Sequence, residues 1–265
     1  MSEAHDPEET RTNISGRTLA DYDERAADFW RGTRDHDVRQ NIDTLLGCIE
    51  GVIGGQTTLS PPLSPLLILH NRGQTTFIGG QSTLSPPLCP PLSPPLSPLL
   101  ILDFGCGPGR DLKTFRELGH TAIGLEGAPS FAAMAREYSG CEVWQQDFLA
   151  LDLPPARFDG IFANASLFHV PTAELARVLR ELHDTLKPGG VLFSSNPRGN
   201  NEEGWNRGRY GVYHDLERWR AYLVAAGFAE LAHYYRPPGL PLEQQPWLAS
   251  AWRKQPMERA LAHPR

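Results

Sequence analysis

Short apolar runs and helical stripes of apolar residues alternate along the second half of this chain. The runs, which predict buried strands, occupy 99–102, 121–126, 142–146, 158–163 and 191–195. Apolar residues at helical spacing lie between them, most clearly over 175–186. Alternation of strands and helices is typical of a parallel sheet covered on both faces. We therefore expect an α/β fold with a doubly wound, mostly parallel sheet of seven strands.

The last two strands are predicted over 228–235 and 247–253, joined by the proline-rich loop 236–246. A helix over 216–223, stopped by Gly227, precedes them. Parallel neighbours need a crossover connection, and no helix separates these two strands. We expect them to form an antiparallel edge of the sheet.

The first fifty residues differ in pattern from the rest. Residues 1–15 are charged or small and lack periodicity, which predicts a disordered tail. Apolar residues recur at helical spacing from Leu19, and we interpret 16–50 as an N-terminal helical lid. A polar connector between its two apolar faces supplies three candidate substrate contacts, Trp30, Arg34 and His36. The alternative is a solvated connector without a ligand role.

Residues 51–98 form a Pro-, Ser- and Leu-rich insertion with an internal repeat. The segment Ser-Pro-Leu-Leu-Ile-Leu occurs at 64–69 and again at 97–102, and only the second copy continues into Asp103. Prolines at this density cannot join a sheet interior. We interpret the insertion as disordered. The alternative is a docking site for a partner that binds Pro-rich motifs.

A glycine-rich turn opens the predicted core, which spans 99–254 and precedes a tail over 255–265. Asp103 ends the buried strand, and three glycines follow before the next helix: Gly105, Gly107 and Gly109. Glycine lets the backbone approach a ligand closely, and the N–H groups of the following helix then face it. A carboxylate at the mouth of the turn repels a pyrophosphate but attracts a sulfonium, which indicates S-adenosylmethionine (SAM). The alternatives are another nucleotide or a purely structural turn.

Polar residues end the strands that follow the turn. Because ligands bind at the carboxyl ends of such strands, we expect Glu126 to bond ribose hydroxyls; its alternative is an exposed loop acid. Asp147 is expected to accept a hydrogen bond from an adenine amino group, beside the Phe148 backbone. Asn164 ends the next strand, where it either faces the methyl group or caps the turn. His169, among apolar residues, is either packed or functional.

The predicted loop 196–214 mixes guanidinium groups, amides and aromatic rings. Arginine forks bind carboxylates, so this composition favours a small, amino-acid-like acceptor. The candidate acceptor contacts are Asn196, Arg198 and Arg209. The alternative is a surface loop whose arginines are incidental.

Composition argues against several other classes of protein. The formal net charge of −6 argues against a nucleic-acid-binding platform. Four cysteines lie far apart without a C-x-x-C pair, so we expect neither a metal site nor a disulfide framework. The polar, acidic N-terminus predicts no secretory signal, and no apolar run approaches membrane-spanning length. We expect a cytoplasmic enzyme with a small-molecule substrate.

With these residues in view, the chain from 22 to about 253, without the insertion, resembles a class I SAM-dependent methyltransferase, a family with a Rossmann-like sheet. The glycine turn and the Leu-Lys-Pro-Gly-Gly segment at 186–190 are common to many small-molecule members. Four other stretches resemble the C-terminal methyltransferase domain of the ovothiol-biosynthesis enzyme: 29–38, 136–148, 194–199 and 236–241.

That resemblance implies methyl transfer from SAM to an imidazole nitrogen of a 5-thiohistidine. It implies cofactor contacts at Asp103, Gly105, Gly107, Glu126, Asp147 and Phe148, to which the pattern above adds Gly109 and Asn164. Removal of the imidazole proton would fall to Tyr210, Tyr213 or His214. The insertion departs from the family pattern, and we expect no iron-dependent sulfur-transfer domain in this chain. Two alternatives stay open: a carboxylate or other heteroatom as acceptor, and a catalytically silent module of the same fold.

Deletion of residues 55–96 tests the interpretation of the insertion. We expect the shortened chain to fold and to bind SAM as the full chain does, because a proline-rich segment contributes no strand to the sheet. Soluble yield and calorimetric titration with SAM are the measurements. Loss of soluble protein on deletion would contradict the interpretation.

Overall fold

The computed structural model describes residues 7–51 and 97–256. Most of the predicted insertion and of the predicted C-terminal tail lies outside the described residues. The helices are α1 (Pro7–Glu24), α2 (Ala26–Thr33), α3 (Arg39–Ile49), α4 (Arg110–Glu117), α5 (Pro129–Ser139), α6 (Thr172–Thr185) and α7 (Leu216–Ala225), with short 3-10 helices η1 (Leu167–His169) and η2 (Leu242–Gln244). The strands are β1 (Leu100–Phe104), β2 (Thr121–Glu126), β3 (Glu142–Gln145), β4 (Phe158–Asn164), β5 (Leu186–Pro197), β6 (Glu202–Asn206), β7 (Arg209–Tyr213), β8 (Phe228–Arg236) and β9 (Trp247–Lys254).

Seven strands form one sheet in the order β3-β2-β1-β4-β5-β9-β8. The first five pair in parallel, and β9 runs antiparallel to both β5 and β8. The predicted doubly wound, mostly parallel sheet with an antiparallel edge is confirmed, with β9 inserted between β5 and the outermost strand β8. The strand order reverses between β1 and β4, which is where such sheets bind ligands.

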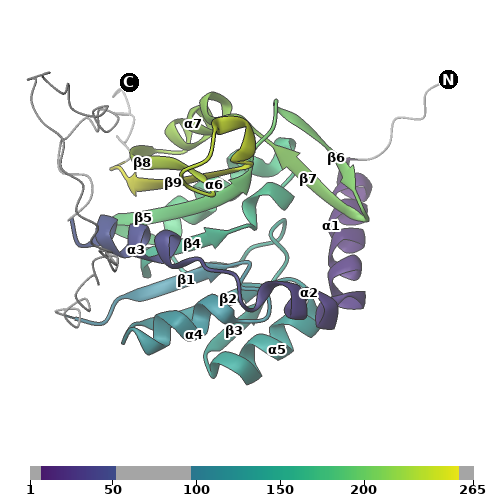
Figure 1. Ribbon diagram of the computed structural model, residues 1–265, viewed down its shortest axis with the longest axis horizontal. Coiled ribbons are helices and arrows are strands. Elements are labelled where there is room, and N and C mark those ends of the chain that lie inside the picture. The colour runs from purple at the N-terminus through teal and green to yellow at the C-terminus, as the bar shows by residue number, and fades with distance from the viewer. Residues whose placement is uncertain (1–6, 52–96, 257–265) are drawn as a thin grey trace, which may run out of the picture.

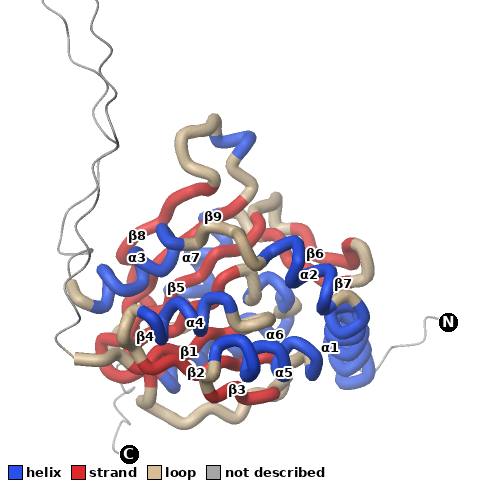
Figure 2. The backbone as a smooth tube through the Cα atoms, turned by 60° about the horizontal axis from the view of Figure 1, so that its bottom comes forward, coloured by secondary structure: helices blue, strands red, loops and turns tan. Residues whose placement is uncertain are grey.

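Helices cover both faces of the sheet (Figure 1). On one face, α3, α4 and α5 lie side by side over the strands, with Leu45 and Phe115 in the buried cluster (Figure 2). On the other face, α6 and α7 contribute Leu179 and Trp219 to a second cluster. No helix in the ranges 7–51 and 97–256 is both long and apolar enough to cross a bilayer.

The segment predicted as a lid divides into two parts with different packing. Helices α1 and α2 stand at one end of the sheet (Figure 1), whereas α3 contacts β4, β5 and β9. Ile42 and Leu45 of α3 are completely buried. Helical spacing in the sequence did not distinguish these parts, because a lid and a core helix both carry a one-sided apolar stripe.

Residues 7–15, predicted to lie in a disordered tail, form the first half of α1. The later part of α1 contacts β7, and the backbone N–H of Tyr210 donates to the Thr18 hydroxyl (3.1 Å). Tertiary contacts of this kind stabilise helices whose sequences carry no apolar stripe. The disorder prediction was therefore wrong for these residues.

The predicted loop 196–214 contains a β-hairpin, β6–β7. Its two-residue turn consists of Arg207 and Gly208, which have φ angles of 49° and 92°. Positive φ at both positions is the geometry of a type I′ hairpin turn. The sequence did not reveal the hairpin because both strands are short and mix polar and aromatic residues on both faces. Strand β5 also begins earlier than predicted, at Leu186 rather than at 191.

Substitution of Leu45 by Ala tests whether α3 belongs to the core. Because Leu45 is completely buried, we expect the free energy of unfolding to fall by about 2–5 kcal/mol in urea titrations. Asp43→Ala on the same helix is the matched control: its ion pair with Arg39 is exposed, and we expect a change below about 1 kcal/mol. Equal, small effects of both substitutions would show that α3 is a detachable lid.

Candidate active site

A cavity of about 940 Å³ opens at the carboxyl ends of β1 and β4, where the strand order reverses. Its walls come from the glycine turn after β1, the polar strand ends, α1, the α2–α3 connector and β7. In Figure 1, α1 and the β6–β7 hairpin stand side by side at this end of the sheet. The volume lies at the upper end of the range for small-molecule sites.

The three glycines of the turn have different roles, although all have positive φ. A Cβ on Gly105 would come within 2.4 Å of Ser166 Cβ, so only glycine fits beneath that wall of the cavity. A Cβ on Gly107 would meet nothing within 4 Å, which leaves open space over the turn. Gly109 does not line the cavity: its Cβ would lie 2.8 Å from the Ala135 backbone, so it permits α4 to pack on α5. Its predicted cofactor contact therefore stays a prediction, whereas its packing role is visible in the structure.

Glu126 joins the end of β2 to the glycine turn. Its carboxylate accepts hydrogen bonds from the backbone N–H groups of Gly107 and Ala128, both at 2.9 Å. Burial raises the pKa of Glu126 to about 7, and the backbone donors oppose that shift. The side chain lines the cavity, as a residue that bonds ribose hydroxyls must.

Asp103 lies deeper than predicted. It is buried below the cavity and does not line it, and its Oδ2 has no hydrogen-bond partner within the described structure. Burial, and then the negative charge of Asp111, raises the pKa of Asp103 well above its usual range. The turn from Gly105 to Gly107 lies over the strand end, because the N–H groups of Gly105 and Cys106 donate to the Leu125 carbonyl. Asp103 is therefore not part of the cavity lining, and its predicted cofactor contact stays a prediction.

Asp147 and Phe148 line the cavity where the adenine site was predicted. The Phe148 ring stacks on Phe104 at a centroid distance of 4.3 Å. The Asp147 carboxylate accepts one hydrogen bond from the Leu149 N–H (2.8 Å) and another from the hydroxyl of Ser15 on α1. Helix α1 thus reaches the adenine side of the cavity.

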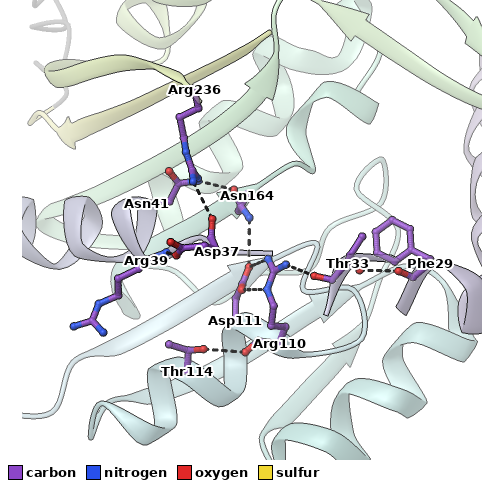
Figure 3. Close-up of polar contacts among 10 residues, drawn as sticks. All are labelled: Phe29, Thr33, Asp37, Arg39, Asn41, Arg110, Asp111, Thr114, Asn164 and Arg236. Carbon is purple, nitrogen blue, oxygen red and sulfur yellow. Dashed lines mark hydrogen bonds and ion pairs between the residues drawn. The ribbon is translucent and has the colours of Figure 1, made fainter. Parts of the chain in front are cut away.

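A chain of polar contacts ties the N-terminal segment to the glycine turn (Figure 3). The Arg110 guanidinium donates twice to the Asp111 carboxylate, at 2.7 and 3.0 Å, and once to the Thr33 carbonyl, at 2.7 Å. Asn164 donates to Asp111 (3.4 Å) and accepts from the Asn41 amide (2.9 Å). Asn164 lines the cavity while its amide is engaged in this network, so it both borders the ligand space and holds the connector.

The predicted acceptor contacts divide into two groups. Trp30, His36 and Arg209 line the cavity. Three others do not: Arg34, Asn196 and Arg198. Arg34 pairs with Asp35 on the surface, Asn196 is buried outside the cavity, and Arg198 donates to the Leu242 carbonyl. These three side chains therefore lie outside the cavity lining, and their roles in acceptor binding stay predictions.

Of the predicted proton acceptors, Tyr210 and Tyr213 line the cavity and His214 does not. The His214 ring lies against Tyr222 and Trp219 of α7, at centroid distances of 5.3 and 6.4 Å. His214 directly follows Tyr213, the last residue of β7, and its side chain points away from the cavity that Tyr213 lines. A segment interpreted as a loop gave no such side-chain directions. His214 is therefore packed against α7 rather than in the cavity lining, and its role as a proton acceptor stays a prediction.

Several other residues that line the cavity were not predicted as ligand contacts. Tyr22 and Thr18 come from α1, His169 from η1, and Arg236 and Trp247 from the ends of β8 and β9. Tyr22 was visible only as an apolar position of a helix, and His169 as a histidine among apolar neighbours. Arg236 lies in one of the stretches that carry the family resemblance, which was the only sequence signal for it.

Comparison with known proteins agrees with this geometry. Residues 101–190 match the family described as "Methyltransferase domain". A trans-aconitate 2-methyltransferase of Azoarcus sp. is 35% identical over 104 residues, which are 38% of this chain and 40% of that protein. A malonyl-[acyl-carrier protein] O-methyltransferase of Erwinia pyrifoliae is 35% identical over 107 residues, 40% of each chain. The chain thus spans about two fifths of the length of these relatives.

Two solved structures share the fold. A SAM-dependent methyltransferase of Mesorhizobium loti aligns with a TM-score of 0.53 and 22% identity over 61% of this chain and 94% of that one. The 1,6-didemethyltoxoflavin-N1-methyltransferase of Burkholderia thailandensis, solved with 1,6-didemethyltoxoflavin and S-adenosylhomocysteine, aligns with a TM-score of 0.64 and 19% identity over 97% of this chain and 93% of that one.

The fold is therefore that of the solved class I SAM-dependent methyltransferases, and residues 101–190 match the methyltransferase-domain family. These similarities support the predicted enzyme class and S-adenosylmethionine as its cofactor. The narrower resemblance to the ovothiol enzyme is not tested by them.

The residues of the cavity fit SAM. The open space over Gly107 gives the ligand access to the turn, and Glu126 offers a carboxylate at the ribose position. The unpartnered Oδ2 of Asp103 belongs to a buried acid whose ionised form a cation in the cavity would stabilise. Phe148 supplies an aromatic surface on the adenine side.

Two glycine substitutions separate ligand contact from packing. Gly107→Ala places a methyl group in the open ligand space, and we expect at least about a tenfold loss of S-adenosylhomocysteine affinity with about 1 kcal/mol of destabilisation. Gly109→Ala presses on the Ala135 backbone, and we expect a loss of about 1–3 kcal/mol in unfolding free energy. Calorimetric titration and urea unfolding measure the two quantities. A larger affinity loss at Gly109 than at Gly107 would contradict the assignment.

Proposed function

We propose that the protein transfers a methyl group from SAM to a ring nitrogen of a small imidazole-containing amino acid of the 5-thiohistidine type. The observation that carries this proposal is the second half of the cavity, beyond the SAM residues. Its walls include the aromatic rings of Phe168, Tyr210 and Tyr213 and the guanidinium of Arg209. A flat, aromatic compartment with a cation suits a planar ring that bears a carboxylate.

Closure of the compartment favours a small acceptor over a macromolecule. One side of it is lined by α1, through Thr18 and Tyr22, and by β7, through Arg209 and Tyr210. The hydrogen bond from the Tyr210 N–H to the Thr18 hydroxyl joins the two elements. Exclusion of water in such a space strengthens the electrostatic interactions that orient an acceptor. SAM, when bound, supplies the electrophilic methyl group. The chain's own contribution is alignment of the acceptor nitrogen, which can supply roughly 7–11 kcal/mol of a bimolecular barrier.

Arg209 is the group best placed to hold the acceptor's carboxylate. Its guanidinium carbon lies 5.0 Å from the centroid of the Tyr22 ring, and its Nε is 3.5 Å from the Asp21 carboxylate. That ion pair is long, so the remaining guanidinium N–H groups can serve a ligand. The Burkholderia neighbour is named as an N1-methyltransferase, and the sequence stretches quoted above resemble an imidazole methyltransferase, so both support a ring-nitrogen acceptor.

The test pairs acceptor screening with one substitution. We expect incubation with SAM and 5-thiohistidine to give S-adenosylhomocysteine and a product heavier by one methyl group, with the methyl located on an imidazole nitrogen by NMR. We expect Arg209→Gln to raise the acceptor KM at least about tenfold. Arg207→Gln, an exposed arginine at the turn of the same hairpin, is the control and should change KM less than twofold.

Each alternative has its own outcome. Methylation of a dicarboxylate but of no imidazole would replace the proposed acceptor by a carboxylate, the reaction type that the name of the Erwinia relative states. Binding of S-adenosylhomocysteine without transfer to any acceptor of either kind would favour a catalytically silent module.

A further inference from the structure

A tyrosine and a histidine outside the predicted catalytic set meet inside the cavity. The hydroxyl oxygen of Tyr22, on α1, lies 2.6 Å from Nε2 of His169, the last residue of η1. Their rings are edge to face, with centroids 5.4 Å apart. Both side chains line the compartment that we assign to the acceptor.

The backbone fixes which nitrogen of His169 carries hydrogen. Nδ1 lies 2.6 Å from the carbonyl oxygen of Tyr210, which can only accept a hydrogen bond. Nδ1 therefore carries the hydrogen, and in the neutral ring Nε2 has a free lone pair. It follows that the Tyr22 hydroxyl donates to Nε2, and its oxygen keeps lone pairs for another donor.

The surroundings keep the histidine neutral and the tyrosine protonated until a proton is delivered. Burial lowers the pKa of His169 to about 4, and the nearby Arg209 cation lowers it further. Burial raises the pKa of Tyr22, whereas Arg209 opposes that shift, and the carboxylates of Glu126 and Asp21 add to it. On its remaining side the His169 ring lies against Phe168, at a centroid distance of 3.9 Å.

We propose that Tyr22 and His169 form the proton acceptor of this site, so that Tyr22 is a catalytic residue and His169 acts through it. The acceptor's ring N–H proton moves to the Tyr22 oxygen, and the Tyr22 proton moves to Nε2 of His169. The N–H bond of the acceptor and the O–H bond of Tyr22 break; a new O–H bond and a new Nε2–H bond form. The ring nitrogen lone pair is released, and His169 ends as an imidazolium that returns the proton to solvent.

The other tyrosines of the cavity lack an equivalent partner. The Tyr213 hydroxyl accepts from the Asn206 amide at 3.3 Å, and the Tyr210 ring lies against exposed Trp205 at the rim. Neither hydroxyl bonds a histidine nitrogen within the described part of the chain, and that of Tyr210 bonds the Glu203 carboxylate instead. This inference rests on the proposed function for the identity of the acceptor, but the state of His169 does not.

The first measurement needs no acceptor. The protein is labelled with 15N-histidine, and the His169 resonances are assigned by their absence in His169→Gln. We expect the neutral Nδ1–H form at pH 7 and protonation of the ring only below about pH 5. An Nε2–H form or an imidazolium at pH 7 would overturn the proposal, whether or not an acceptor has been found.

The second measurement is steady-state kinetics of Tyr22→Phe, which retains the ring contacts with Phe29 and Phe131. We expect kcat to fall at least about 100-fold, while the acceptor KM and the affinity for S-adenosylhomocysteine stay within about threefold of the wild-type values. We also expect the residual kcat to rise with pH, because the acceptor then loses its own proton. Tyr234→Phe is the matched control. Its hydroxyl also joins the N-terminal segment to the core, through Asn41 (2.9 Å), but lies outside the cavity lining.

The outcomes distinguish the two proposals. A wild-type kcat in Tyr22→Phe, or an equal loss of kcat in Tyr234→Phe, would show that the Tyr22–His169 contact has only a structural role. An unmodified protein that binds S-adenosylhomocysteine but methylates no imidazole would overturn the proposed acceptor instead, and the NMR result alone would then decide the state of the pair. If His169→Gln does not fold, the assignment is made with Tyr22→Phe, which shifts the same resonance.

Discussion

The buried charge pair between Arg110 and Asp111 is the interaction on which the rest of the site depends. A bidentate guanidinium–carboxylate contact is strong and directional, and each partner is expensive to leave alone once removed from water. Here another N–H of Arg110 donates to the backbone of α2, and the Asp111 carboxylate also accepts from Asn164 at the end of β4. One ion pair at the start of α4 thereby attaches the N-terminal segment beside the glycine turn. Without it, α2 would lose this attachment to α4.

Burial shifts the pKa values of three ionisable groups at the cavity toward their neutral forms. It raises the pKa values of Asp103 and Glu126 and lowers that of His169, because each group is easier to keep neutral when water is excluded. A positively charged ligand reverses the balance for the two carboxyl groups, since its charge stabilises their ionised forms. The same exclusion of water leaves the histidine with a free lone pair at neutral pH.

The alternation of strands and helices, the glycine turn and the acids at the strand ends were all legible in the sequence, because each depends on residues adjacent in the chain. What the sequence did not show depends on contacts between distant segments. The Tyr22–His169 contact joins positions 147 residues apart. Asp103 was placed at the mouth of the turn because a strand end does not reveal how far the following loop lies over it. The positions of His214 and Arg198 outside the cavity lining were hidden for a related reason: without the hairpin, the directions of the side chains that flank it are undetermined.

The position of β9 has a consequence for how the protein is made. Strands β1 to β5 can pair as they are synthesised, but β5 and β8 find their common neighbour only when Trp247–Lys254 has emerged. Until then both present unpaired N–H and C=O groups, and the edge of β5 is apolar, with Val191, Leu192 and Phe193 completely buried in the finished sheet. On the ribosome the half-built sheet is therefore exposed to aggregation until nearly the whole described chain has been translated. Chaperone demand should peak in that interval, and the pairing of β9 with β5 and β8 closes this part of the sheet.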